Sequence, residues 1–76
     1  MNKTRRAALG NISEQLTTLK DDLESLRDEE QEYVDNMPES LQSGEKHDTA
    51  ENAVSSMDSA IDSIDEAINS IGEAES

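Results

Sequence analysis

Apolar residues recur along the first third of the chain at alternating spacings of three and four positions, and polar residues fill the gaps. This heptad spacing brings the apolar side chains onto one face of a helix. Pro38 disfavours helix at the residue before it, so the helix should end near Asp35 or Asn36. The pattern predicts an amphipathic helix over about residues 4–35. Its apolar residues are Leu9, Ile12, Leu16, Leu19, Leu23 and Leu26.

The last third of the chain contains a seven-residue repeat of small and branched apolar residues. It predicts a second helix over about residues 45–72, which begins after Gly44 and ends at Gly72. A start at Asp48, with a capping-box spacing to Glu51, is the less favoured alternative. The apolar face of this helix comprises Val54, Met57, Ile61, Ile64, Ile68 and Ile71, and Ala53, Ala60 and Ala67 recur beside it.

The connection between the two helices covers about residues 36–44. Its stretch from Pro38 to Leu41 has the composition of a single helical turn that follows Asn36 or Met37. Leu41 is expected to fold back and cover the end of the core. Ser43 and Gly44 interrupt the chain again before the second helix.

The two apolar patterns mirror each other about the connection. If position i faces position 80 minus i, an apolar residue of one helix meets an apolar residue of the other in six successive layers, such as Leu19 with Ile61. The same register places the basic residues Lys3, Arg5 and Arg6 beside Glu73 and Glu75. The mirror predicts an all-α fold, an antiparallel two-helix hairpin that packs like a coiled coil.

A two-helix hairpin has only one buried stripe, and helices in proteins draw most of their stability from packing. The alanine column of the second helix widens the apolar face and allows another helix to approach closely. We therefore expect a homodimer that forms a four-helix bundle. The alternative is a monomer completed by its binding partner.

Composition restricts the class of protein. The 76 residues allow one domain, and low apolar content with a net charge of -13 is also the signature of disorder, which only the mirrored pattern overrides. Cysteine is absent, so disulfides and thiolate metal sites are excluded. No apolar run follows the basic start and none is long enough for a membrane span, which predicts a cytoplasmic protein that does not bind membranes.

Acidic residues are densest in the second half of the first helix, which holds eight acids in the fifteen residues from Asp21 to Asp35. A solvated helix face would also be acidic, but solubility requires a net charge of only about 2 to 8 in magnitude. The excess predicts a protein partner with a basic surface and argues against direct nucleic-acid binding. The predicted partner-binding residues are Asp21, Asp22, Glu24, Asp28, Glu29, Glu32 and Asp35.

One polar constellation lies near the connection. The mirror brings Glu30, Tyr33 and His47 to the same end of the hairpin, either as a small polar site or as a frayed, solvated end of the bundle. Motifs for nucleophilic catalysis, phosphate binding or di-iron carboxylate chemistry are lacking. The sequence therefore predicts no enzyme, no cofactor and no metal.

The stretch from Leu26 to Tyr33, the turn from Asp35 to Gln42 and the Ala-Ile repeats resemble short acidic helical-hairpin proteins of bacteriophages and mobile elements. That group has no assigned activity, so the resemblance implies no site residues. It implies a phage accessory protein that acts on a host protein in the host cytoplasm. Together with the excess of acidic residues, it predicts a protein that occupies or blocks a basic site on that host protein, as an anti-defence inhibitor or a nucleic-acid mimic. The alternative is an assembly module whose bundle seam is completed by another helical protein.

Overall fold

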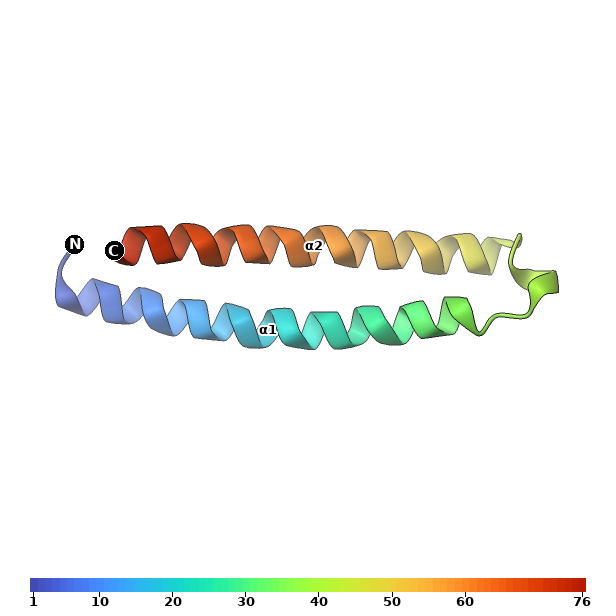
Figure 1. The fold of residues 1–76 in the computed structure, drawn as a ribbon, viewed down its shortest axis with the longest axis horizontal. Helices are drawn as coiled ribbons and strands as arrows, with labels where there is room; N and C mark the ends of the chain where they lie inside the picture. Colours follow the sequence, from blue (N-terminus) through green and yellow to red (C-terminus); the bar gives the residue numbers. More distant parts are fainter.

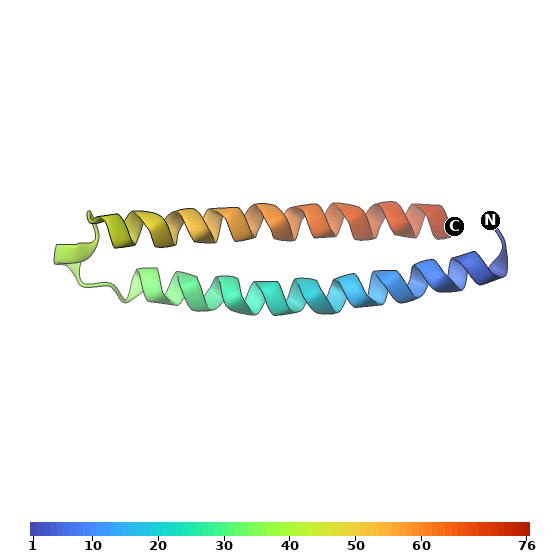
Figure 2. The same cartoon turned by 180° about the vertical axis from the view of Figure 1, so that it is seen from behind.

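The computed structural model describes residues 1–76 as two long antiparallel helices (Figure 1). Helix α1 spans Lys3–Asp35, a short 3-10 helix η1 spans Glu39–Leu41, and α2 spans Glu45–Glu75. The molecule measures 59 × 14 × 12 Å between Cα atoms, and both termini lie at the end opposite the connection (Figure 2). The structure confirms the all-α hairpin. Neither helix has a stretch apolar enough to cross a membrane.

The helix ends follow local chemistry. Asn2 caps α1 by accepting a 2.8 Å hydrogen bond from the backbone N–H of Arg5. Helix α2 begins directly after Gly44, where a Cβ atom would lie 3.2 Å from the carbonyl oxygen of Leu41. The predicted end of α2 at Gly72 is wrong, because the helix continues to Glu75. Glycine stops a helix by adopting positive φ, and no residue of this chain does so.

Met37, rather than Leu41, covers the loop end of the core. The predicted helical turn is present as η1, whose first hydrogen bond runs from the Leu41 N–H to the Pro38 carbonyl at 2.8 Å. Leu41 nevertheless remains 53% exposed, whereas Met37 is 7% exposed. The expectation for Leu41 is therefore wrong, because the turn places Met37 between the helices and leaves Leu41 outside them.

Only one of the two heptad rows of α1 is partly buried, so the six predicted apolar layers are incomplete. Leu9, Leu16 and Leu23 are partly buried. The alternate residues of the heptad remain exposed, since Ile12, Leu19 and Leu26 are 47%, 58% and 57% exposed. The prediction of fully paired layers is corrected in this respect, because a single neighbouring helix encloses a narrower stripe than both heptad rows occupy.

The free end of the hairpin also departs from expectation. No ion pair joins the basic stretch Lys3–Arg6 to the acidic residues 73–75. The whole chain has four buried residues, Val34, Met37, Ala50 and Val54, and all of them lie near the connection. The tightest part of the core is therefore at the loop end.

Candidate functional site

The acidic segment, defined here as residues 21–35, occupies the half of α1 nearest the connection. Asp21, Asp28 and Asp35 recur every seven residues and form a row with about 10 Å between successive side chains along the helix. Asp22 and Glu29 form a second row beside it, and all five residues are exposed. Glu32 is also exposed, whereas Glu24 and Glu30 are partly buried. The seven predicted partner-binding acids therefore lie on the outer surface of one helix, apart from the partly buried Glu24.

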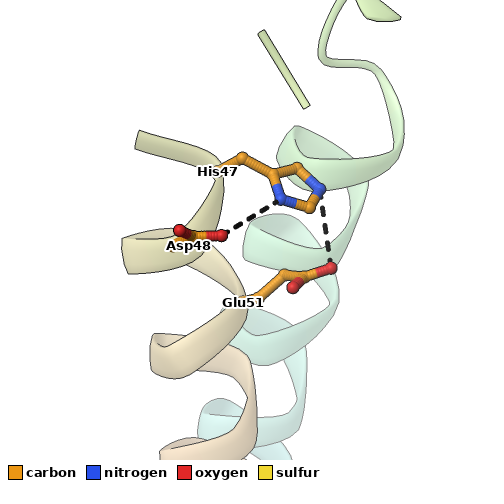
Figure 3. Close-up of side chains that lie close together, drawn as sticks. All are labelled: His47, Asp48 and Glu51. Atoms are coloured by element: carbon orange, nitrogen blue, oxygen red, sulfur yellow. Dashed lines mark ion pairs between the residues drawn. The ribbon is translucent and has the colours of Figure 1, made fainter. Parts of the chain in front are cut away.

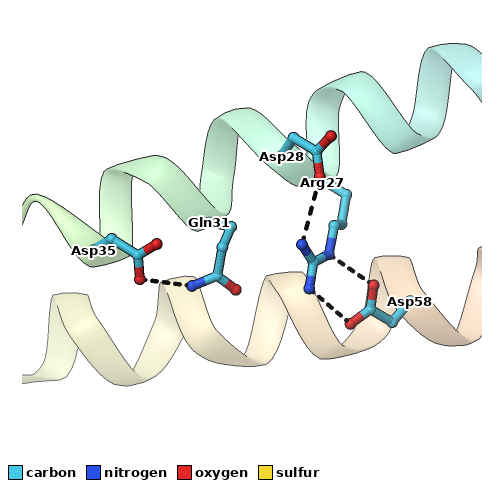
Figure 4. Close-up of polar contacts among 5 residues, drawn as sticks. All are labelled: Arg27, Asp28, Gln31, Asp35 and Asp58. Atoms are coloured by element: carbon cyan, nitrogen blue, oxygen red, sulfur yellow. Dashed lines mark hydrogen bonds and ion pairs between the residues drawn. The ribbon is translucent and has the colours of Figure 1, made fainter.

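Few of these carboxylates have a cation within reach. Glu24 lies 4.0 Å from the Lys20 ammonium, and Asp28 lies 3.4 Å from the Arg27 guanidinium. Asp35 accepts a 2.9 Å hydrogen bond from the neutral Gln31 amide (Figure 4). The other acids of the segment form no ion pair. The outer surface of α1 therefore keeps most of its negative charge.

The nearest cations are directed toward the other helix instead. Lys20 Nζ lies 2.8 Å from Asp65 Oδ1. Arg27 Nε lies 2.8 Å from Asp58 Oδ1, with a second Arg27–Asp58 contact of 3.4 Å (Figure 4). The hydrogen bond that Lys20 donates to Asp65 raises the pKa of Lys20 above its ordinary value, against a smaller opposing effect of desolvation. The hydrogen bond that Arg27 donates to Asp58 raises the pKa of Arg27 in the same way. These two cations bridge the helices along one flank of the hairpin.

Sequence reasoning did not find these bridges. The shorter ion pair of Arg27 is with Asp58 on α2 and not with Asp28 of the acidic segment. A signal was present, because Lys20 and Arg27 are seven residues apart, and so are Asp58 and Asp65. Such matched spacing beside an apolar row is typical of charges that pair across a coiled coil.

An open groove of about 570 Å³ lies beside the connection. Its walls combine the exposed ring of Tyr33 and the apolar atoms of Met37, Pro38 and Leu41 with charged side chains. The carboxylates of Glu29 and Glu32 border it, and Lys46 contributes one cation. We call this the loop groove. The loop groove therefore places apolar side chains directly beside two carboxylates of the acidic segment.

His47 does not join Glu30 and Tyr33 in a shared site. Its Nε2 lies 3.5 Å from a Glu51 carboxylate oxygen and its Nδ1 lies 3.9 Å from Asp48, both on its own helix (Figure 3). Glu30 and Tyr33 instead border a groove with residues of α2 that do not include His47. No ion pair or hydrogen bond links His47 to Glu30 or Tyr33. The alternative of a frayed end is wrong as well, because the buried core lies here.

The His47 cluster is a weak candidate for metal binding. One ligand atom from each of His47, Asp48 and Glu51 lies within 4.8 Å of the others. All three side chains come from one stretch of α2, and both carboxylates are exposed. Structural metal sites fix their ligands through buried second partners, and this cluster has none: the Nδ1 atom of His47 is buried without a hydrogen bond. We assign no ion to it.

Comparison with protein-family models, characterised proteins and solved structures finds no match for this chain. The resemblance to phage proteins therefore stays a prediction.

Proposed function

We propose that this protein acts by binding rather than by catalysis, and that the acidic segment of α1 occupies a basic site on another protein. The observation that carries the proposal is the set of exposed carboxylates between Asp21 and Asp35, most of which have no ion pair within the hairpin. Concentrated charge of one sign steers an oppositely charged partner and sets the register of docking. A basic surface would supply the missing counter-charges.

The loop groove supports the same proposal. An arginine or lysine side chain has an apolar stem and a cationic head, so it buries the stem and keeps the head near charge or water. The groove offers an exposed aromatic ring at Tyr33, with Glu29 and Glu32 at its border. A cation over an aromatic ring gains further attraction. We propose that one basic side chain of the partner inserts here.

The resemblance to phage proteins makes a host protein the proposed partner, and inhibition of a host defence protein the proposed role. Close mimicry of nucleic acid is less favoured. The hairpin carries one net charge per about 4.5 Å of its 59 Å length, against one per about 1.7 Å in duplex DNA. A side-by-side dimer would reach one charge per about 2.3 Å, still below the duplex value. A general acidic surface accounts for the observed charge.

Two triple variants with equal charge changes test the location of the binding surface. The first is Asp22→Asn, Glu29→Gln and Glu32→Gln in the acidic segment. The second is Asp62→Asn, Glu66→Gln and Glu73→Gln in α2. All six residues are exposed and form no ion pair. Asp58 and Asp65 are unsuitable controls, because they anchor Arg27 and Lys20.

The measurement is capture of host proteins by the immobilised hairpin, followed by titration of the captured protein at low and high salt. We expect the α1 variant to lose about tenfold in affinity, since exposed ion pairs contribute about 0.2–1 kcal/mol each. Its binding should also depend less on salt. The α2 variant should bind like the wild type. Equal losses in both variants would mean that total charge matters rather than the acidic segment, and wild-type binding by the α1 variant would refute the mechanism.

A second function is favoured by the exposed apolar residues of α1. Ile12, Leu19 and Leu26 are about half exposed in the hairpin, as expected for an assembly module that another helix completes. Association through such residues would not weaken as salt rises, whereas acidic binding would. The salt dependence of the captured complex separates the two functions.

A further inference from the structure

One flank of the hairpin carries an unpartnered apolar row. Ile12, Leu19, Leu26 and Tyr33 recur every seven residues on α1 and are 47%, 58%, 57% and 50% exposed. We call these four residues the open row. It extends for about 30 Å along the helix at 1.5 Å per residue. Isolated exposed apolar residues are normal, but four of them in one row along a helix indicate an interaction surface.

Small side chains of α2 border the same flank. Tyr33 shares one groove with Ala50 and Ala53, and Leu26 and Tyr33 share another with Met57. Ala60 and Ala67 continue the column of Ala53 at intervals of seven residues and are exposed. Large residues on one helix beside small residues on the next form a surface that an incoming helix can approach closely.

The opposite flank is already closed. There the Lys20–Asp65 and Arg27–Asp58 ion pairs bridge the two helices. A pair of antiparallel helices has two flanks. The two ion pairs lie on one flank, and the open row and the alanine column lie on the other. Further helices are therefore directed to a single face of the hairpin.

The exposed area indicates how much surface remains to be covered. The hairpin exposes 5512 Å², whereas a compact protein of its 8.3 kDa mass exposes about 4,600 Å². The excess of about 900 Å² is close to the roughly 800 Å² that each partner buries in a standard protein interface. Association with one partner through an interface of standard size would bury this excess area.

We infer that the occupant of this face is a second copy of the chain, and that two hairpins pack their open rows together as a four-helix bundle. Because its four residues are equally spaced, the open row of one copy can pack antiparallel against the same row of a second copy, as a twofold interface requires. Two cations lie at the ends of this face. Arg5 continues the open row at the free end and Lys46 continues the alanine column at the loop end, and neither forms an ion pair in the hairpin. A second copy, with its 19 acidic residues, supplies carboxylates to both.

Sedimentation equilibrium of the full chain tests this inference with matched variants. Leu19→Gln with Leu26→Gln removes the centre of the open row, and the control places glutamine at the exposed neighbours Thr18 and Ser25. Ala60→Lys blocks the alanine column, and its control is Ser59→Lys at an exposed neighbour. Because Ala60 is exposed in the hairpin, its replacement tests the interface even if the leucine variant unfolds. Circular dichroism reports the helical content of each variant.

We expect the wild type and both controls to sediment as dimers, and the open-row and Ala60 variants to sediment as helical monomers. The dimer should strengthen when salt rises from about 0.01 M to about 1 M, because the Debye length falls from about 30 Å to about 3 Å and screens the repulsion between two chains of charge -13. Acidic binding to a basic partner has the opposite salt dependence, so the two proposals fail independently. A wild type that remains monomeric at both salt concentrations would overturn the inference, as would an Ala60 variant that dimerises normally. An open row that instead binds a different helical protein would also overturn it.

Discussion

The two ends of the hairpin reach different degrees of burial. At the loop end, Val34, Met37, Ala50 and Val54 are only 5–7% exposed. Toward the free end, Leu9, Leu16, Ile64 and Ile71 are only partly buried. The free end carries the larger leucine and isoleucine side chains, so residue hydrophobicity does not explain the difference.

The connection explains it. After α1, the backbone N–H of Met37 bonds to the Val34 carbonyl at 3.2 Å, and the turn leaves the Met37 side chain only 7% exposed at this end. This turn supplies a third wall that the free end lacks. Burial in a two-helix hairpin is therefore decided by the number of neighbouring elements and not by the apolar pattern alone.

The largest expected effect contrasts Val54→Asp with Ile68→Asp, two substitutions in the same heptad row of α2. A carboxylate at the buried Val54 position costs about 3–5 kcal/mol, against a total stability of about 4–11 kcal/mol for 76 residues. Ile68 is partly buried near the free end, where a charge reaches water, so we expect a loss of about 1–2 kcal/mol. Far-UV circular dichroism during thermal unfolding measures both. Equal destabilisation would show that the two ends are packed alike.

A smaller contrast tests the turn itself. Met37→Ser removes the buried thioether side chain and should lower the free energy of unfolding by about 2–3 kcal/mol. Leu41→Ser removes a side chain that is 53% exposed and should cost less than about 1 kcal/mol. Urea unfolding curves give both values. A larger loss for Leu41 than for Met37 would restore Leu41 as the residue that covers the core.

The smallest effect concerns the flank closed by ion pairs. Because Asp65 raises the pKa of Lys20 above 10.5, the folded state holds this proton more tightly than the unfolded state. The stability from this pair is therefore fully present below pH 10.5 and is lost as the pH rises through the higher pKa of the folded protein. We expect the melting temperature to fall in that alkaline range in the wild type and to fall less in Lys20→Met. Lys3→Met, at an exposed lysine without an ion pair, is the control and should behave like the wild type. A Lys20 variant with an unchanged alkaline profile would contradict a contribution from this pair.

The candidate site was only partly predictable. The acidic residues of the binding surface could be read from the sequence, because a run of carboxylates beside an apolar row must lie on the outer face of a helix. The lack of counter-charges around these acids could not be read from the sequence. It depends on the side chains of Lys20 and Arg27, which bind Asp65 and Asp58 on the other helix. The separation of His47 from Tyr33 likewise depends on how the helices are rotated at the turn.

The sequence by itself determined the two helices, their antiparallel order and the position of the connection. These follow from local periodicity, from Pro38 and Gly44, and from the mirrored apolar pattern, none of which requires knowledge of distant contacts. Only the tertiary structure decided which of the two heptad rows of α1 is enclosed. Leu16 and Leu19 are equally apolar, yet Leu16 is partly buried and Leu19 is 58% exposed. Burial depends on the rotation of each helix about its axis and on the elements around it, and that arrangement is set by the whole assembly of side chains rather than by any one segment.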